Sequence, residues 1–581
     1  MNESKEKIDK IRHSLSHILA AAVLEKWPEA KLGIGPTIEN GFYYDILFPN
    51  DGPTEEDLKG LEDRMEEIIN EDLPFSGSKV NTEKAKEIFS DQPFKLELIE
   101  DFSEKNKDLT IYKTGEKFKD LCKGGHVERT SEINPSGFTL DKIAGAYWKG
   151  DEENKMLTRI YGLAFETEEE LEKYIQKREE AKQRDHRKLN KKLNLFLISD
   201  EVGKGLPIFT REGEIVRDEI KSFINKEKQK RGYEFVKTPH IAKSDLYHKS
   251  GHWGKYDAMF KPFEADDEEY VVKPMNCPHH FQIYNNKQRS YKELPIRLAE
   301  NGTVYRYEQS GELSGLFRVR SLTIDDTHIF LREEQIKEEL RSVLALIKNI
   351  LEALGFEKYR ARISARDPES PEDYLGSEKT WQQAENALKS ALEKADIEYE
   401  IGQGEAAFYG PKIDIMLQDA LKRDWQLSTI QLDYNQPKNF DMTYKNEKGK
   451  EVRPTILHVA TTGSIERILG ILIEHYKGKL PTWLHPTQVQ ILPISEEETS
   501  YGEQIKEELE NEEIRVEIPN VDKSLSKRIR NFETDKIPYA LIVGPDEKSA
   551  KTVSIRHREK GDIGEKELEE FKTKLLKEIE K

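Results

Sequence analysis

A run of charged residues at positions 166–193 divides the chain, because a segment this polar cannot contribute to a hydrophobic core. The run is dense in Glu, Lys and Arg, and Leu171, Tyr174 and Ile175 recur within it at helical spacing. This pattern predicts a charged helical connector that separates an N-terminal unit from a larger central one. A chain of 581 residues has room for about three or four domains, each with a core of its own.

A second boundary falls at L-P-T-W-L-H-P, residues 480–486, where two prolines end a helical pattern. Beyond it, strand-like and helix-like runs alternate, from V-Q-I-L-P-I through Y-A-L-I-V-G to a closing helix, which predicts a compact α/β domain. The sequence therefore divides into four parts: 1–165, 166–193, 194–485 and 486–581.

Between the connector and this boundary, several strand-like runs follow one another without a helix between each pair. The runs are Y-V-V-K-P, G-T-V-Y-R-Y-E, F-R-V-R-S-L-T-I, K-I-D-I-M-L and S-T-I-Q-L-D-Y. Such spacing predicts an antiparallel sheet flanked by helices, within an α+β protein of several domains. Neither a P-loop nor a Rossmann glycine pattern is apparent, so any ATP phosphates would have to be held by arginine side chains.

The charge balance and the apolar content exclude some classes of protein. The net charge of −19 argues against a chain that coats nucleic acid indiscriminately, although basic clusters occur at 182–192, 526–530 and 554–560. No apolar run approaches the roughly 20 residues that span a bilayer, and the charged N-terminus shows no signal peptide. Two cysteines far apart form no disulfide framework. We therefore expect a soluble, cytoplasmic protein with reduced thiols and no membrane partner.

Both cysteines stand just before histidines, Cys122 in D-L-C-K-G-G-H and Cys277 in M-N-C-P-H-H. In addition, H-S-L-S-H places His13 and His17 four residues apart, on one face of a predicted helix. This pair could bind zinc together with a cysteine and a histidine from elsewhere, or form a metal-free hydrolytic pocket that positions a water. From the residues alone, the cysteines could belong to two metal sites, two nucleophiles, one of each, or neither.

Arginines recur in the strand-like runs of the central unit. Arg306 and Glu308 lie in V-Y-R-Y-E, Arg318 lies in F-R-V-R, and Arg467 lies in G-S-I-E-R. A strand can present such arginines on one face, where each guanidinium can bind a phosphate through two hydrogen bonds.

These blocks together resemble the threonyl-tRNA synthetases, a family of class II aminoacyl-tRNA synthetases, from His13 to the C-terminus. Residues 205–217, G-L-P-I-F-T-R-E-G-E-I-V-R, resemble the motif 1 region, and Pro239 matches the motif 1 proline of the dimer interface. R-Y-E with F-R-V-R resembles motif 2, and G-S-I-E-R-I-L-G resembles motif 3. K-P-M-N-C-P, D-D-T-H-I-F and F-Y-G-P-K-I are further matching blocks.

The resemblance implies ATP-dependent attachment of L-threonine to tRNA(Thr) through a threonyl-adenylate, by a cytoplasmic homodimer. It also implies the identity of the parts, with an editing domain at 1–165, a class II catalytic domain at 194–485 and an anticodon-binding domain at 486–581. The central antiparallel sheet would then be the class II synthetase core.

The resemblance assigns Cys277, His328 and His458 as ligands of one zinc ion per subunit. Three protein ligands leave one coordination position open, which the family uses for the amino group and the hydroxyl of threonine. Valine lacks that hydroxyl and is rejected, whereas serine keeps it and differs by one methyl, which discriminates by only about 1–3 kcal/mol. A second, hydrolytic site for seryl-tRNA is therefore expected. In the family it is a metal-free pocket, formed here by His13, His17, Lys95, Asp120, Cys122 and His126.

Further roles follow from the same resemblance. Arg306, Arg318 and Arg467 are the expected catalytic residues, and they would bind the phosphates of ATP together with Mg²⁺. The expected ATP-binding residues are Arg306, Glu308, Arg318, Gln426, Thr429 and Arg467. The expected threonine-binding residues are Asp326, Tyr409 and Gln431, and Lys412 lies in a matching block. The expected anticodon-binding residues are Glu547 and Arg556.

The sequence departs from the family pattern at four places. His279 stands where the family usually has glycine, and Ile324 stands where many bacterial members have glutamine near the threonine pocket. C-K-G-G-H replaces the commoner C-R-G-P-H, and the chain begins at the editing domain without the small ubiquitin-like domain of many relatives.

Three other functions compete with this interpretation. A non-catalytic tRNA-binding paralogue would be expected to have lost Arg306, Arg467 or a zinc ligand, and all are present. A zinc hydrolase built on H-S-L-S-H leaves motifs 2 and 3 unexplained and lacks the Glu of H-E-x-x-H. A sister class II enzyme for serine or proline would not need the combination of Cys277, His328 and His458.

Overall fold

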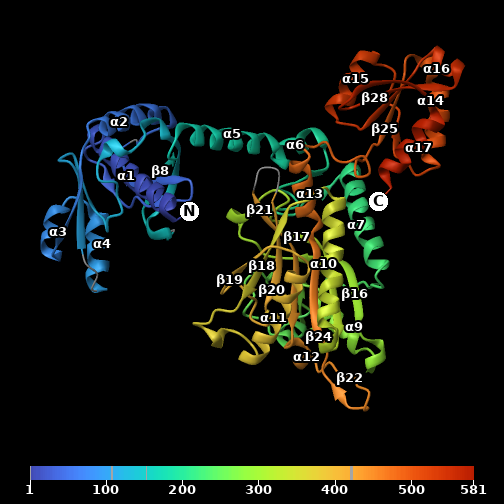
Figure 1. Cartoon of the computed structure of the whole chain (residues 1–581), viewed down its shortest axis with the longest axis horizontal. Coiled ribbons are helices and arrows are strands. Elements are labelled where there is room, and N and C mark those ends of the chain that lie inside the picture. The colour runs from blue at the N-terminus through green and yellow to red at the C-terminus, as the bar shows by residue number, and fades with distance from the viewer. Residues whose placement is uncertain (1, 51, 106–108, 152, 419–422, 581) are drawn as a thin grey trace. The chain divides into compact units, whose positions relative to one another are not determined.

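The computed structural model describes residues 2–50, 52–105, 109–151, 153–418 and 423–580, and it contains two compact units, Met1–Glu180 and Ala181–Lys581 (Figure 1). Helix α5 (Glu168–Arg184) crosses the boundary between them, and α6 (His186–Leu193) follows. Asp185 interrupts the two helices and caps α6, since its side chain accepts a hydrogen bond from the Arg187 amide. The charged run therefore forms two helices in succession.

The first unit is built around α1 (Asn2–Lys26), whose apolar stripe includes Leu15, Ile18 and Leu19, all fully buried. The helix packs on an antiparallel sheet in the order β1-β3-β8-β7, with β2 paired to β3. The strands are β1 (Lys31–Leu32), β2 (Thr37–Ile38), β3 (Gly41–Leu47), β7 (Phe138–Tyr147) and β8 (Met156–Ala164).

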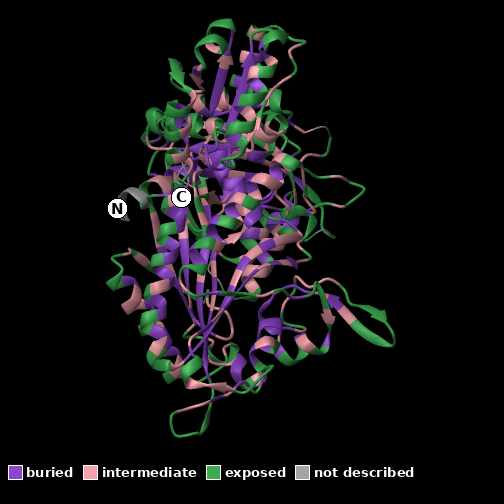
Figure 2. Cartoon of the chain, turned by 90° about the vertical axis from the view of Figure 1, so that its right-hand side faces the viewer, coloured by how far each residue is buried: buried purple, intermediate pink, exposed green. Residues whose placement is uncertain are grey.

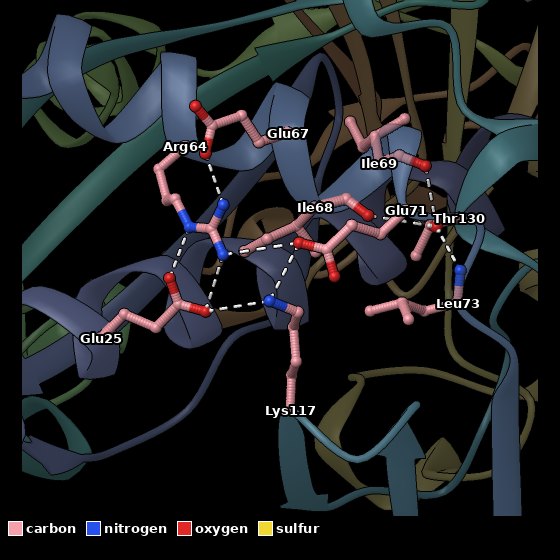
Figure 3. Close-up of polar contacts among 9 residues, drawn as sticks. All are labelled: Glu25, Arg64, Glu67, Ile68, Ile69, Glu71, Leu73, Lys117 and Thr130. Atoms are coloured by element: carbon pink, nitrogen blue, oxygen red, sulfur yellow. Dashed lines mark hydrogen bonds and ion pairs between the residues drawn. The ribbon is translucent and has the colours of Figure 1, made fainter.

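A smaller antiparallel sheet, in the order β4-β5-β6, completes this unit together with three helices. Its strands are β4 (Phe75–Val80), β5 (Leu109–Thr114) and β6 (Phe118–Leu121), and the helices are α2 (Leu58–Asn70), α3 (Thr82–Ile88) and α4 (Pro93–Glu104). The turn from β5 to β6 brings Lys117 against the ends of α1 and α2, where it forms ion pairs with Glu25 and Glu71 (Figure 3).

Thr130 closes the C-terminal end of α2 in the same region (Figure 3). Its hydroxyl donates to the carbonyl of Ile69 at 2.9 Å and accepts from the amide of Leu73 at 2.9 Å. The side chain is fully buried, so these bonds satisfy helix-end groups that water cannot reach. Arg64 of α2 also pairs with Glu25, so Arg64 holds α2, and Lys117 holds the hairpin, against the end of α1.

The second unit contains an eight-stranded sheet in the order β11-β16-β17-β24-β21-β20-β18-β19. All neighbours are antiparallel except the two outermost pairs, β11 with β16 and β18 with β19. Its strands are β11 (Glu234–Phe235), β16 (Ile296–Tyr305), β17 (Ser321–Leu331), β18 (Tyr359–Ala365), β19 (Tyr399–Gln403), β20 (Lys412–Gln418), β21 (Asp424–Asp433) and β24 (Thr455–Ser464). The predicted antiparallel sheet is confirmed.

One face of this sheet is apolar and carries the main core of the second unit. Figure 2 shows the buried residues in purple. Ile329, Leu457, Ile430 and Ile413 come from four successive strands and are all fully buried there. Helices with apolar stripes cover this face: α7 (Arg211–Gln229), α10 (Ile336–Ala353), α11 (Glu378–Lys394) and α13 (Ile465–His475). Because side chains alternate along a strand, the residues between these apolar ones project from the opposite face.

Two of the predicted strands differ in the structure. Y-V-V-K-P contributes to β14 (Glu268–Val272), but this strand belongs to a separate small sheet with β12 (Ile241–Lys243) and β13 (Phe263–Ala265). The prediction that F-R-V-R lies in a strand is wrong, because β17 begins only at Ser321. The four residues instead close a tight loop, in which the Phe317 amide donates to the Ser314 carbonyl at 2.8 Å. The arginines of motif 2 are therefore presented by a loop between β16 and β17.

The C-terminal part folds as predicted into a mixed sheet in the order β26-β25-β27-β28-β29, flanked by helices. The strands are β25 (Val489–Pro493), β26 (Val516–Glu517), β27 (Tyr539–Val543), β28 (Thr552–His557) and β29 (Gly561–Glu567). The helices are α14 (Thr499–Glu510), α15 (Leu525–Thr534), α16 (Pro545–Ala550) and α17 (Leu568–Ile579). Strand β29 and helix α16 were not predicted, since both are short and polar. Among the described residues, no helix is long and apolar enough to cross a membrane.

Candidate functional site

The polar face of the large sheet brings together three residues that are distant in sequence. His328 on β17 and His458 on β24 stand directly opposite each other in the antiparallel register, and Cys277 is the first residue of α9 (Cys277–Asn285). The Cys277 sulfur and one nitrogen of each histidine lie within 4.8 Å of one another. One thiol and two imidazoles at this spacing are a donor set that suits zinc.

The second nitrogen of each histidine is already engaged. Nε2 of His458 donates to Asp433 at 2.9 Å, which leaves Nδ1 free. Nε2 of His280 donates to Glu300 at 3.2 Å, and in that tautomer Nδ1 of His280 accepts the 2.8 Å hydrogen bond from Nδ1 of His328. His328 therefore keeps an unprotonated Nε2. A histidine that binds a metal requires this arrangement, with one nitrogen held by an outer partner and the other free.

Glu300 is the buried end of this chain of hydrogen bonds. It also accepts hydrogen bonds from the amide and the hydroxyl of Thr238, next to the motif 1 proline. Burial alone would raise the pKa of Glu300, but the hydrogen bonds from His280 and Thr238 and the charge of Lys273 outweigh it and lower the pKa to about 2. The carboxylate therefore stays ionised and holds the proton on Nε2 of His280.

Burial shifts the pKa values of two of these residues, Cys277 and His328. It raises the pKa of the Cys277 thiol well above its usual value, assisted by Asp326 and Asp433, and it lowers the pKa of His328 well below its usual value. A metal ion that binds the Cys277 sulfur has to displace its proton, so binding here would release a proton and weaken at low pH.

The positive charges of Arg306 and Arg318 both act on Arg467. Arg467 lies in the first turn of α13, whose N-cap is Ser464, and its Nε donates to the Phe317 carbonyl at 3.1 Å. Burial and the positive charges of Arg306 and Arg318 lower the pKa of the Arg467 guanidinium. Three like charges held this close together favour a ligand with several negative charges.

Two of the predicted ATP-binding residues contact each other. Nε of Arg318 donates to Oε2 of Glu308 at 2.8 Å, and a second carboxylate, that of Glu312, lies 3.1 Å from Nη2 of Arg318. Arg320 bonds the backbone carbonyl of Glu308 through Nε and Nη2. A phosphate that binds Nε or Nη2 of Arg318 therefore has to replace a carboxylate partner.

Asp414 organises the polar face at β20 and β21, although sequence reasoning did not select it. Its carboxylate accepts hydrogen bonds from Ser364, Lys412, Gln426 and Thr429, at 2.5–2.9 Å. The side chain is buried, and it faces the same side of the sheet as the two histidines. The signal in the sequence was an aspartate between two isoleucines of a strand, K-I-D-I, where a carboxylate needs partners.

The three predicted threonine-binding residues line the surroundings of the cysteine and histidine group. Asp326 accepts from Nδ2 of Asn276 at 2.9 Å, and Gln431 donates to the Gly410 carbonyl at 3.1 Å. The ring of Tyr409 lies 5.7 Å from that of His458. Burial, followed by the charges of Cys277, Asp433 and Asp326, raises the pKa of Tyr409 well above its usual value, so its hydroxyl is a donor at neutral pH.

Two of the four departures from the family pattern, His279 and Ile324, lie in the second unit. His279 is buried on α9, and among the described residues neither of its ring nitrogens has a hydrogen-bond partner. It is not part of the group formed by Cys277 and the two histidines. Ile324 lies on the same face of β17 as Asp326, opposite Ser464 at a bulge in the pairing with β24. A methyl-bearing side chain therefore occupies this corner of the polar face.

A second polar site lies in the first unit, in a cavity of about 410 Å³. His13 and His17 project into it from α1, Lys95 from α4, Asp120 from β6, and Cys122 from the following loop. The Cys122 sulfur lies 3.4 Å from Nε2 of His13 and 3.2 Å from Nε2 of His126. The structure thus brings together all six residues predicted for this site, and four of them, His13, His17, Cys122 and His126, have ligand atoms within 4.8 Å of one another.

Burial favours the uncharged forms of the thiol and the imidazoles in this cavity, beside the ion pair of Lys95 and Asp120. Burial raises the pKa of the Cys122 thiol to about 11, against the opposing hydrogen bond from Gly124. Burial, together with His17 and His13, lowers the pKa of His126 to about 2. At neutral pH the cavity therefore offers a thiol and neutral imidazoles, and Cys122 is a poor nucleophile.

Two further residues hold this cavity together and were missed. Tyr44 on β3 is fully buried; its hydroxyl donates to Asp120 at 2.5 Å and accepts from Lys95 at 3.1 Å. Ser14 accepts from the Val127 amide and lies 3.3 Å from Nδ1 of His126. The tyrosine stands in an alternating strand and the serine between the two histidines of the helix, so neither carried a signal beyond packing.

Of the two predicted anticodon-binding residues, Glu547 lies on α16 and Arg556 lies on β28. Glu547 accepts from the Ser554 hydroxyl at 2.6 Å, and Arg556 lies two residues further along the same strand. Glu547 also accepts from the Gly544 amide and closes the first turn of α16. Nη2 of Arg556 donates to Glu533 of α15 at 2.9 Å, and sequence reasoning did not select Glu533.

Comparison with known proteins identifies three families along the chain. The tRNA synthetase class II core domain (G, H, P, S and T) matches residues 260–476, the anticodon binding domain matches residues 488–578, and the threonyl and alanyl tRNA synthetase second additional domain matches residues 109–161.

Among curated proteins, the chain is 48% identical to a threonine–tRNA ligase of Synechococcus elongatus, over 96% of this chain and 93% of that protein. It is 46% identical to one of Thermus thermophilus, over 98% of this chain and 88% of that protein. A crystal structure of the RNA binding domain of threonyl-tRNA synthetase from Cryptosporidium parvum aligns with a TM-score of 0.65 and 38% identity, covering 68% of this chain and 98% of that one. The chain belongs to the threonine–tRNA ligase family of class II aminoacyl-tRNA synthetases.

Proposed function

We propose that the protein attaches L-threonine to tRNA(Thr) in two steps. In the first, the carboxylate of threonine attacks the α-phosphorus of ATP and pyrophosphate leaves. In the second, a hydroxyl of the terminal ribose attacks the threonyl carbonyl and AMP leaves. Two observations carry the proposal: the group of one thiol with two imidazoles, and Arg467 under the repulsion of Arg306 and Arg318.

Arg306, Arg318 and Arg467 would bind the phosphates, with Mg²⁺ accompanying the nucleotide. The repulsion at Arg467 supports this role, because a bound polyphosphate would neutralise the positive charges. The same charges would stabilise the negative charge that develops on the leaving pyrophosphate. Glu308 would accept a hydrogen bond from the adenine amino group. Its present partner, Arg318, would have to move away first, and their contact is exposed. Gln426 and Thr429 would contact the nucleotide, and their hydrogen bonds to Asp414 would hold both side chains in place.

Cys277, His328 and His458 would hold one zinc ion per subunit. The donor types, the spacing and the free nitrogen on each histidine fit that ion. The bound ion supplies an open coordination position for the amino group and the hydroxyl of threonine. Asp326, Tyr409 and Gln431 would orient the amino acid beside it. A pocket built around a substrate hydroxyl rejects valine, because valine would leave the polar groups of the pocket unpaired.

The cavity of the first unit would hydrolyse seryl-tRNA(Thr) without a metal. Serine passes a site that selects a hydroxyl, so a second site has to remove it. Neutral His13 and His17 can hold a water and take its proton, while Lys95 and Asp120 position the substrate. The cluster of four donors that includes Cys122 also leaves a metal site as the alternative, and metal content distinguishes the two.

The remaining parts of the proposal concern tRNA binding and assembly. Glu547 and Arg556 would contact anticodon bases, which is base recognition on an otherwise acidic chain. Residues 1–165 would be the editing domain, 194–485 the catalytic domain and 486–581 the anticodon-binding domain. The enzyme would act as a cytoplasmic homodimer through its motif 1 segment.

ATP–pyrophosphate exchange across the amino acids tests the proposal. We expect strong exchange with threonine, weak exchange with serine and negligible exchange with valine. Equal exchange with valine would remove the account of hydroxyl selection. No exchange with any amino acid would instead identify a non-catalytic paralogue that binds tRNA.

A further inference from the structure

His186 is the first residue of α6, inside the basic stretch 182–192, and it lies buried against two catalytic elements. Its amide and its Nδ1 both donate to Oε1 of Glu474 at the end of α13, at 3.0 and 2.8 Å. Its Nε2 accepts a 2.9 Å hydrogen bond from the amide of Leu316, in the loop of motif 2. A backbone amide can only donate, so Nε2 is unprotonated and the proton resides on Nδ1.

This residue is not a metal ligand, although Asp185, His186 and Glu474 offer ligand atoms within 4.8 Å of one another. Both ring nitrogens of His186 are used, and both carboxylate oxygens of Glu474 are used, Oε1 by His186 and Oε2 by Arg423. The ring also does more than fill space, since both of its polar atoms bond to catalytic elements.

The loop is shaped to receive the imidazole. Gly315 has a φ of +48°, and a Cβ there would lie 2.1 Å from Nε2 of His186, so only glycine allows the approach. The ring of Phe317 packs against that of His186, with 4.3 Å between centroids. The carbonyl of Phe317 in turn accepts the 3.1 Å hydrogen bond from Nε of Arg467.

We propose that His186 is a positioning residue for ATP. It holds residues 315–317 in place, so that the Phe317 carbonyl orients Arg467 and the adjacent Arg318 enters the site from a fixed backbone. This inference rests on the proposed binding of ATP phosphates by Arg318 and Arg467. It assigns the effect to one hydrogen bond, the one from the Leu316 amide, and not to the contact with Glu474.

Two substitutions separate the roles of the two ring nitrogens of His186. In His186→Gln, the amide oxygen can take the place of Nε2 and accept from Leu316, whereas in His186→Asn the amide nitrogen can take the place of Nδ1 and donate to Glu474. We expect His186→Asn to raise the KM for ATP about tenfold, the effect of losing one buried hydrogen bond. His186→Gln should stay within about threefold of the parent, and the KM for threonine should change little in either variant.

Gly315→Ala disturbs the same contact from the loop, because its Cβ would press on the His186 ring, and it removes neither ring nitrogen nor Glu474. It should also raise the KM for ATP selectively. Hydrogen exchange gives a readout that does not depend on activity: the Leu316 amide should exchange faster in His186→Asn and Gly315→Ala than in His186→Gln.

The inference is overturned if His186→Asn and His186→Gln raise the KM for ATP equally, or if Gly315→Ala leaves it unchanged. A parallel rise in the KM for threonine would likewise show a general structural role. A parent protein without threonine-dependent exchange would instead overturn the proposed function, and normal exchange of the parent separates the two failures.

Discussion

Nε of Arg318 donates a 2.8 Å hydrogen bond to Oε2 of Glu308, so two residues proposed to bind different parts of ATP contact each other. The side chain of Arg318 is 46% exposed, which keeps such an ion pair weak and exchangeable. The structure therefore presents an arginine that is oriented by a carboxylate but can be released to a phosphate.

Replacement of Arg318 by alanine should lower kcat/KM for ATP about 10–100-fold, the effect of losing a hydrogen bond to a charged group. The KM for threonine should change little, because Arg318 belongs to the loop after β16. Exchange rates at varied ATP measure the effect. Arg341→Ala, on the exposed side of α10, is the control, and an equal loss in that variant would contradict the assignment.

Metal analysis should find about one zinc per chain, since one complete set with an open position is proposed. Cys277→Ala should lose the zinc together with threonine activation, whereas Cys122→Ala should keep both. The two cysteines are the only ones in the chain, so each variant is the control for the other. Two zinc ions per chain, with one lost in Cys122→Ala, would instead assign a metal to the cavity of the first unit.

The double variant His13→Ala, Cys122→Ala should charge tRNA with threonine at a rate close to that of the parent. It should also accumulate seryl-tRNA, because it lacks one of the two imidazoles proposed to hold the water, while the synthetic site still accepts some serine. Deacylation of preformed seryl-tRNA measures the effect directly. Equal deacylation by parent and variant would make these residues structural and would leave the synthetase assignment intact.

Cys122 should react slowly with iodoacetamide at neutral pH. Its pKa is raised to about 11, so at pH 8 only about one thiol in a thousand is a thiolate. The rate should rise about tenfold per pH unit and level off near pH 11. Peptide mapping by mass spectrometry separates Cys122 from Cys277. Fast alkylation of Cys122 at pH 7 would identify a thiolate and contradict the raised pKa of this thiol.

Thr130→Val should destabilise the end of α2 by about 1–3 kcal/mol, because the Leu73 amide and helix-end carbonyls would be left buried without partners. Arg64→Ala removes several ion pairs of the same region but should cost less than about 1 kcal/mol, since the pairs are exposed. Hydrogen exchange of the peptide that contains Leu73 measures the free energy of opening. A larger loss in Arg64→Ala would reverse this ranking.

The sequence predicted the element types better than the contacts between them. The α/β pattern after residue 486 and the antiparallel sheet followed from periodicity, because each strand carries its apolar face in its own residues. His328 and His458 were associated only through family resemblance, because strand register depends on pairing that no local pattern encodes. Asp414, His280 and His186 were missed because a single buried polar residue looks the same whether it supports packing or orients a neighbour.

The pairing of β17 with β24 makes the proposed zinc site depend on the exact length of β24. His458 faces His328 only if the number of residues between Thr455 and His458 is unchanged. Deleting one residue between Thr455 and His458 would turn the His458 side chain to the apolar face and move a neighbour to the polar face, although the sheet itself could still form. Under the proposed zinc site, insertions and deletions in β24 should therefore be selected against more strongly than most substitutions. Metal content would then report whether a preparation has assembled its sheet in register.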